Sequence, residues 1–214
     1  AGAVGGKGVA VGGSVGVNVA TYTVETALRN LDDPVVHGAV TLDADDDTNL
    51  IAVAGAGGFG GKTGVGIAIG FSYTDNVVRS QLVDVDGLSH SGSLGLSATG
   101  NGLIIAVTGS VGYATGSGGS GYGGAGTVSI NYTQNTIEAS IADSSTAVGA
   151  TGDLSLLAED RTGIYSFAGA FASGKNLGLG AAIAVNALDN EVLASVQGSV
   201  LQTSGGFTAT AKEA

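Results

Sequence analysis

The sequence contains no cysteine, no tryptophan and no methionine, and it has a single proline in 214 residues. Without cysteine, the chain can form no disulfides, and thiolate metal sites and thiol nucleophiles are excluded. A single proline excludes a collagen-like or proline-rich chain, even though 40 residues are glycine. Aromatic residues make up only 5% of the chain, which suits thin stacked layers better than a bulky globular core.

Basic residues are also scarce. Lysine and arginine number 7 against 18 aspartates and glutamates, which gives a formal net charge of −11. We therefore expect no nucleic-acid partner and little affinity for anionic membrane surfaces, because both interactions need lysine and arginine. The sequence has no run of 18 strongly apolar residues and shows no paired aromatic belts, so we expect it not to span a membrane.

What the sequence does contain is repetition. Two phrases rich in glycine, alanine, valine and serine recur about four times, with a period of roughly 52 to 61 residues. Repeats of this size are typical of units that bury their apolar face only by stacking on their neighbours. The sequence begins and ends inside a repeat, so we expect 1–214 to be one repetitive segment of a longer chain. The first phrase starts at Val15, Ile67, Val128 and Ile183, and the second at Val40, Leu94, Leu154 and Phe207.

The local pattern predicts strands. β-Branched residues alternate with small or polar ones at Val15, Val17 and Val19, and glycine-rich turns separate such runs. A faint helical pattern occurs only at 23–31. The expected fold is all-β, a repetitive solenoid resembling a parallel β-helix. At about 18 to 25 residues per coil, each repeat would supply two or three coils, and the acidic run 43–47 and the glycine-rich loop 116–126 would protrude.

Three elements of the repeat resemble a known family: residues 180–186 (GAAIAVN), 190–194 (NEVLA) and 152–158 (GDLSLLA). They are similar to the repeats of giant secreted Gram-negative surface proteins, such as filamentous haemagglutinin-like adhesins and the large fusobacterial leukotoxin. The resemblance covers essentially the whole chain. It implies export by a type V secretion pathway, a β-helical stalk and attachment to cells or surfaces, and it transfers no catalytic residue.

One repeat position carries asparagine in this family. Asn18, Asn131 and Asn186 match it, whereas Gly70 departs from it in the second copy. We therefore do not expect asparagine to be structurally obligatory there.

Residues 56–63 (AGGFGGKT) fit the relaxed phosphate-loop pattern. A phosphate loop must lead into a helix whose N-terminus faces the phosphates, but the strand-like segment 64–70 follows here. Similar Gly-Lys turns occur at Lys7 and Lys175, so we favour a repeat turn.

Residues 12–16 (GGSVG) match the G-x-S-x-G elbow of serine hydrolases. A hydrolase would also need a histidine base. The only histidines are His37 and His90, which lie beside acidic or serine-rich turns. In a chain so rich in glycine and serine, we interpret the match as coincidental.

Carboxylates are the stronger candidates for chemistry. Calcium prefers six to eight oxygen ligands, which alternate acidic residues and turn carbonyls can supply. The alternative is a solvated acidic turn that discourages edge pairing between strands. The glycine-rich loops lack the aspartates of the calcium-binding G-G-x-G-x-D repeat. The candidate calcium ligands are Asp43, Asp45, Asp47, Asp84 and Asp86.

A sugar-cleaving β-helix enzyme is a further hypothesis, because such enzymes use paired carboxylates. The low aromatic content and the absence of tryptophan argue against it. Tyr113 and Tyr122 flank the long glycine-rich loop, and we predict them to be exposed contact residues.

These observations favour a non-enzymatic, extracellular solenoid that forms the stalk or fibre of a bacterial surface adhesin, without a cofactor other than the candidate calcium. Its expected partners are a receptor or glycan on a host or neighbouring cell. The alternative is a self-assembling subunit of an extracellular filament or sheath, and the third hypothesis is the carbohydrate-active enzyme.

Overall fold

The computed structural model describes residues 1–147 and 150–214, and this part of the chain consists of β-strands and turns without a helix. The prediction of an all-β fold is confirmed. Residues 23–31, where a helical pattern competes, belong to a strand. The strands are β1 (Gly2–Gly5), β2 (Val9–Asp32), β3 (Val35–Val36), β4 (Val40–Asp46), β5 (Asn49–Gly60), β6 (Thr63–Asp86), β7 (Ser89–His90), β8 (Leu94–Gly100), β9 (Leu103–Ala114), β10 (Tyr122–Ala142), β11 (Leu154–Asp160), β12 (Gly163–Gly174), β13 (Leu177–Leu188), β14 (Glu191–Gln197) and β15 (Phe207–Glu213).

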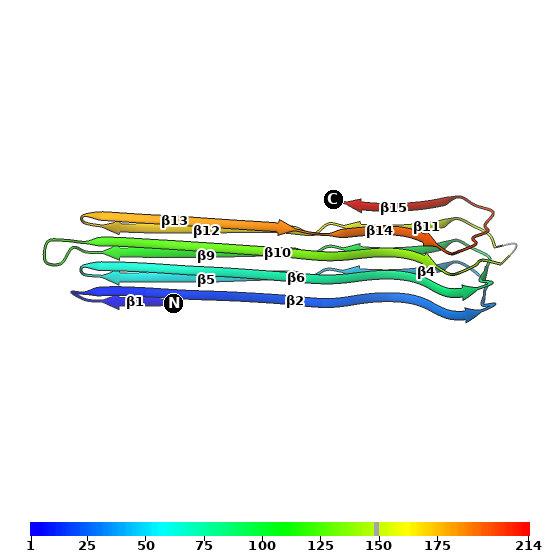
Figure 1. Cartoon of the computed structure of the whole chain (residues 1–214), viewed down its shortest axis with the longest axis horizontal. Helices are drawn as coiled ribbons and strands as arrows, with labels where there is room; N and C mark the ends of the chain where they lie inside the picture. Colours follow the sequence, from blue (N-terminus) through cyan, green and yellow to red (C-terminus); the bar gives the residue numbers. More distant parts are fainter. Residues whose placement is uncertain (148–149) are drawn as a thin grey trace.

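Each sequence repeat forms one flattened coil (Figure 1). In the second coil, β6 runs for 24 residues along the whole molecule, and the shorter strands β8 and β9 bring the chain back. The expectation of two or three coils per repeat is wrong. Coils of 18 to 25 residues assume short strands, whereas here a single strand can be as long as such a coil.

The coils stack as parallel, hydrogen-bonded ladders on both faces of the molecule. One face has the strand order β13-β10-β6-β2, with β14 also paired to β10. The other face is formed by β1-β5-β9-β12 and by β15-β11-β8-β4. Thr63 pairs with Val9 and with Tyr122, and Tyr122 pairs with Leu177, so the coils advance by 54, 59 and 55 residues. This arrangement is a parallel solenoid of the β-helix kind, as predicted.

The pairing of neighbouring strands shows whether the repeat copies aligned in the sequence lie side by side in the structure. All four copies of the second phrase pair in register, with Leu94 beside both Val40 and Leu154. The first phrase is displaced in its second copy, because Val15 pairs with Ile69 rather than with Ile67. The residue that replaces the repeat asparagine is therefore Ser72, not Gly70.

One half of the molecule, in which β4, β8 and β11 form one layer, has a core of large aliphatic side chains. We call this half the leucine half. Leu82, Leu94 and Leu96 are at most 1% exposed, and they pack with Ile137 and Ile141 of the next coil. Burial of such side chains stabilises each coil by about 1.5–3 kcal/mol per residue.

The other half contains no charged residue and no histidine in its strands; we call it the charge-free half. Its interior is lined by glycine, alanine, serine and threonine, with Asn131 buried near its border. A β-carbon at Gly66 would lie 2.3 Å from the Val111 carbonyl oxygen, and one at Gly64 would lie 2.1 Å from that of Tyr113. The two sheets approach so closely here that only glycine fits at these positions. This half comprises residues 9–19, 51–60, 63–72, 105–114, 122–131, 165–174 and 177–186.

At the opposite end from this half, each coil turns through a residue with positive φ. Asn30, Asp84 and Asp143 have φ of 53°, 51° and 48°, and Gly198 has 58°. Asparagine, aspartate and glycine are the residues that tolerate the left-handed region best. The same corner is therefore rebuilt in all four coils.

Candidate functional site: two outer faces and a buried polar seam

The acidic run 43–47 was predicted to be a protruding turn, but most of it is strand. Asp43 and Asp45 lie on β4 with exposed side chains, whereas Asp46 points inward and is 7% exposed. Only Asp47 follows in the connection to β5. The prediction of a protruding acidic turn is wrong, because residues 43–46 pair with β8 as a strand, and the alternation of that strand turns Asp46 inward.

The other two candidate calcium ligands lie where β6 ends. Asp84 occupies the left-handed corner, and the Asp86 carboxylate accepts a hydrogen bond of 3.4 Å from Ser145 Oγ. Among residues 1–147 and 150–214, no group of three or more acidic or histidine side chains is arranged to hold a metal ion. Calcium binding by these aspartates remains a prediction.

A buried polar seam separates the two halves. Asp46 accepts hydrogen bonds from Tyr22 (3.2 Å), Asn76 (3.3 Å) and Thr48 (2.7 Å). Burial and the neighbouring Asp46 carboxylate raise the pKa of Tyr22 far above its usual value. This side of the seam is therefore held by a neutral phenol that donates to a carboxylate.

The third coil repeats the seam. Asp160 is fully buried, and its carboxylate accepts hydrogen bonds from Asn135 Nδ2 (3.3 Å) and from the Thr162 backbone amide (2.8 Å). Sequence reasoning missed this element. The signal was the in-register asparagine of successive coils, Asn76 beside Asn135.

A small ion-pair cluster lies on the sheet β15-β11-β8-β4 of the leucine half. The Glu159 carboxylate accepts hydrogen bonds from Lys212 (2.6 Å) and Arg161 (2.7 Å). The hydrogen bond from Lys212, assisted by Arg161, lowers the pKa of Glu159 against the opposing effect of its partial burial. The cluster ties β11 to β15.

The charge-free half ends in glycine-rich turns, residues 6–8, 61–62, 115–121 and 175–176, which we call the tip. The two tyrosines predicted to be contact residues lie there. Tyr113 is the last residue but one of β9, just before the long loop, and is 42% exposed; Tyr122 opens β10 and is 48% exposed. The loop itself, residues 115–121, extends beyond the other turns at this end (Figure 1). Residues 122–126, expected to be loop, begin β10.

The Gly-Lys turns lie at the same tip. Lys7, Lys62 and Lys175 occupy the turns that precede β2, β6 and β13. Thr63, which closes the phosphate-loop match, opens the strand β6 rather than a helix, and residues 12–16 lie within β2. Neither motif therefore has the helix that its chemistry requires.

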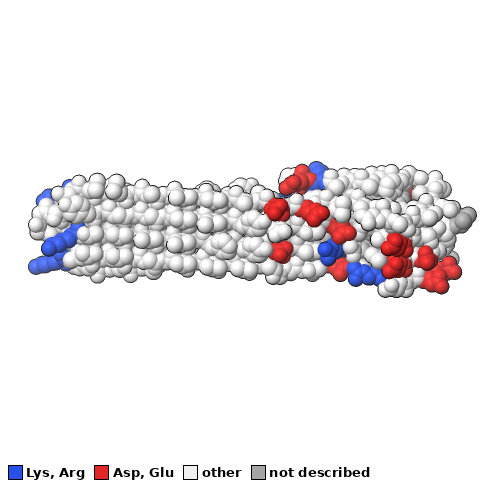
Figure 2. All heavy atoms as spheres, viewed as in Figure 1, with Lys and Arg blue, Asp and Glu red and all other residues white. Residues whose placement is uncertain are grey.

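Charge is sharply segregated along the strands. Figure 2 shows lysine at the tip, an uncharged expanse over the adjoining half, and carboxylates confined to the leucine half. On this face the first carboxylates are Asp75 and Asp189, beside the stacked rings of Tyr73 and Tyr132, whose centroids are 5.8 Å apart. Burial and Asp75 raise the pKa of Tyr73, and the hydrogen bond to Asp189 raises that of Tyr132.

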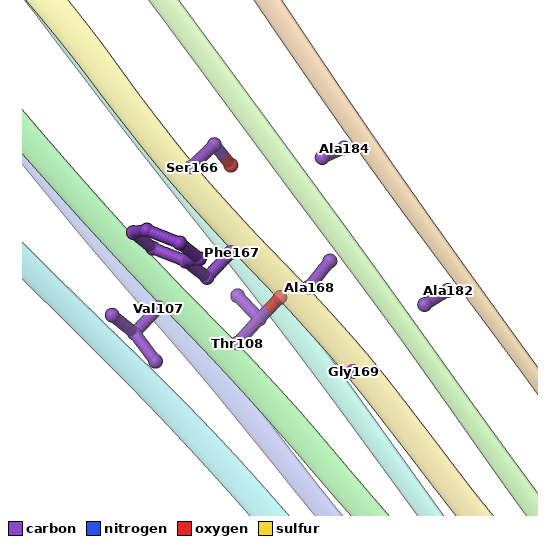
Figure 3. Close-up of a pocket in the computed structure, with 8 residues that line it drawn as sticks. All are labelled: Val107, Thr108, Ser166, Phe167, Ala168, Gly169, Ala182 and Ala184. Atoms are coloured by element: carbon purple, nitrogen blue, oxygen red, sulfur yellow. The ribbon is translucent and has the colours of Figure 1, made fainter.

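A shallow groove opens on the charge-free half, with a volume of about 590 Å³ (Figure 3). Ser166 and Ala168 of β12 point toward the strand that carries Ala182 and Ala184, whereas the Phe167 ring points away from it, to the outer side. Its lining has no carboxylate, histidine, lysine or arginine, and the Ser166 hydroxyl bonds to the Ser129 hydroxyl at 3.1 Å. The groove can bind by shape and apolar contact, but its lining supplies no acid or base.

These features define the described part of the chain as a flattened parallel β-solenoid with two extensive outer faces. No helix in the described part of the chain is long and apolar enough to cross a membrane. No family model, curated protein or solved structure significantly matches the sequence.

Proposed function

We propose that this chain is a non-enzymatic structural segment of an extracellular bacterial surface protein, in which stacked coils build a stalk or fibre that carries adhesive contacts. The observation that carries the proposal is the ladder itself. The long strand β6 pairs over its whole length with β2 on one side, and with β10 on the other through Val83. Such stacking extends a molecule by repetition and distributes load over many hydrogen bonds.

The family resemblance supports an extracellular location and export by a type V pathway. The receptor or glycan that the fibre contacts would meet exposed outer residues, of which Tyr113 and Tyr122 at the tip are the first candidates. Their aromatic rings are suited to sugar or protein contacts.

Stretching a single molecule between its termini tests the structural role. We expect stepwise extension, with each coil of 54 to 59 residues releasing about 19 nm at roughly 3.4 Å per residue. Leu82→Ala should lower the force of one step, because Leu82 is fully buried, whereas the outward-facing Val77→Ala should leave all steps unchanged. A chain that extends smoothly without resistance would contradict a mechanical role.

A second candidate, self-assembly into a filament, is favoured by a separate observation. Among the residues that the structure describes, β2 pairs only with β6 at one end of its sheet, and β13 pairs only with β10 at the other. Open strand edges pair readily with another chain. Electron microscopy over a range of concentrations, with and without a calcium chelator, should show filaments if this candidate is correct, and loss of filaments on chelation would support the calcium prediction.

A further inference from the structure

Both outer faces of the charge-free half are apolar along the same stretch of strand. On one face Val15 is 70% exposed and Ile183 is 56% exposed. On the other, Val53 is 73% exposed and Phe167 is 62% exposed. Exposed apolar surfaces of this kind, here present on both faces of a thin two-layer slab, mark sites of contact with another protein or with a membrane.

Tyrosines mark the borders of this slab. Tyr122 and Tyr132 project from the same strand ten residues apart, or about 33 Å at roughly 3.3 Å per residue. The hydrocarbon core of a lipid bilayer is about 30 Å thick. On the opposite face Tyr113 and Tyr165 lie near the two ends of the apolar stretch. Tyrosine is enriched where hydrocarbon meets headgroups, because its ring is apolar and its hydroxyl is polar.

The charges beyond the borders fit the same partner. Three of the seven basic residues, Lys7, Lys62 and Lys175, lie at the tip, whose turns carry no carboxylate. Lipid phosphates at that surface are their natural partners. At the other border, Asp75 and Asp189 begin the leucine half, which carries the carboxylates and would stay in water.

We propose that the charge-free half inserts into a lipid bilayer, with the lysine tip at one headgroup layer and the Tyr73–Tyr132 stack at the other. Its strands then run across the membrane and its coils stack along the membrane plane. A second copy is the less suitable cover, since face-to-face packing explains neither the matched tyrosine borders nor the lysines at the tip.

Inside hydrocarbon, backbone N–H and C=O groups must be hydrogen-bonded, and the central strands of the stack fulfil this condition. Strand β6 is paired on both sides, and so is β10 through Thr133. Among the described residues, the outer edges of β2 and β13 in one sheet and of β12 and most of β5 in the other are unpaired, and the Ala1 ammonium donates to the Gly55 carbonyl oxygen at the β5 edge. Unpaired backbone and charge are costly in lipid. The inserted form therefore requires a further coil or a neighbouring copy at these edges.

This inference goes beyond the structural role and replaces the expectation that the segment does not span a membrane. That expectation relied on the absence of a long apolar run and of visible aromatic belts in the linear sequence. Folding assembles the belts from different coils, as the pairing of Tyr73 with Tyr132 shows.

Flotation with vesicles of phosphatidylcholine and phosphatidylglycerol tests the proposal. The purified chain should float with the vesicles. Ile69→Asp places a carboxylate on the outward face within the slab and should weaken binding about 100-fold, by the cost of a charge in hydrocarbon. Val77→Asp, outward on the same strand but beyond the tyrosine border, should bind like the original chain, and circular dichroism checks that both variants fold. Equal flotation of both variants, or no flotation of the original chain, overturns the proposal.

Depth of insertion provides an independent readout, because the chain has no native tryptophan. Phe167→Trp should show blue-shifted fluorescence that is quenched by bromines placed on the lipid tails, whereas Thr23→Trp in the leucine half should show neither effect. The chain could instead bind to the vesicle surface through its lysines alone. In that case salt would abolish binding and the indole of Phe167→Trp would stay unquenched, and this result would overturn insertion. A blue shift without vesicles that grows with protein concentration would assign the faces to a second copy, and would overturn it as well.

Discussion

Inward-facing glycines set the distance between the two sheets near the tip. Gly66 lies inside, where an added β-carbon would meet the Val111 carbonyl oxygen at 2.3 Å, whereas Gly126 faces outward with nothing within 4 Å. Both lie in strands of the same sheet. Their roles therefore differ only in the direction that the side chain would take.

We predict that Gly66→Ala lowers the free energy of unfolding by about 1–3 kcal/mol, because the sheets must separate to admit the methyl group. Gly126→Ala should be neutral or stabilise by up to about 1 kcal/mol, since alanine restricts the unfolded chain without a clash. Urea unfolding followed by circular dichroism measures both. Equal effects of the two changes would contradict the close approach of the sheets.

Buried hydroxyls inside the solenoid differ in their partners. Among the described residues, Thr108 Oγ1 is buried with no hydrogen-bond partner, whereas Thr74 Oγ1 donates to Thr133 Oγ1 at 3.0 Å. Thr108→Val should therefore raise stability by about 1 kcal/mol, and Thr74→Val should lower it by a similar amount. Thermal unfolding of the two variants compares them directly, and destabilisation by Thr108→Val would show that its hydroxyl is satisfied in solution.

Strands β11 and β15 are joined by an interaction that depends on pH. The pKa of Glu159 lies below its ordinary value of 4.5 in the folded state, chiefly because Lys212 donates to it. A carboxyl group with a lowered folded pKa adds stability above its unfolded pKa and loses it as the pH falls through the folded value.

We therefore expect the stability difference between the original chain and Glu159→Gln to be present near neutral pH, to fall as the pH drops below about 4.5, and to vanish once the pH is below the folded pKa of Glu159. Urea midpoints measured at several pH values test this prediction. Lys212→Gln should reproduce part of the change, as it removes the main donor. A difference that is independent of pH would assign the effect of Glu159 to packing instead of charge.

At the level of strands, the sequence predicted the alternation and the register of the second phrase, because leucine and alanine recur there at fixed positions. It did not predict the coil size. Period-two alternation identifies a strand but does not say how far the strand runs before the chain turns back. The error at Ser72 has the same origin, since Ile67 and Ile69 both fit an alternating pattern and only pairing with Val15 distinguishes them.

The seam between the halves escaped prediction for a related reason. Asp46 belongs to an acidic run that looks uniformly solvated in the sequence. Only the return of β4 beneath β2 brings this carboxylate to Tyr22 and Asn76. Contacts of this kind depend on where the chain folds back, which local patterns leave open.

Across the whole molecule, the charges that sum to −11 are distributed unevenly between the two ends. The acidic residues gather in one half, and the tip of the other carries Lys7, Lys62 and Lys175 (Figure 2). Total charge alone therefore underestimates the affinity of the tip for anions. Salt should weaken any binding at the tip, since exposed charges are screened within about 8 Å at physiological ionic strength.

The central claim is that one repeat makes one coil, and distances between spin labels test it most directly. The chain has no cysteine, so labels can be placed at Thr23→Cys and Val77→Cys, which are paired in register on neighbouring strands. Strong spin–spin coupling between these sites, 54 residues apart, is the predicted result, with clearly weaker coupling between Thr23→Cys and Leu193→Cys, which lies three strands away. Labels at 23 and 77 that lie more than about 20 Å apart, several times the roughly 4.8 Å spacing of paired strands, would contradict the one-coil repeat.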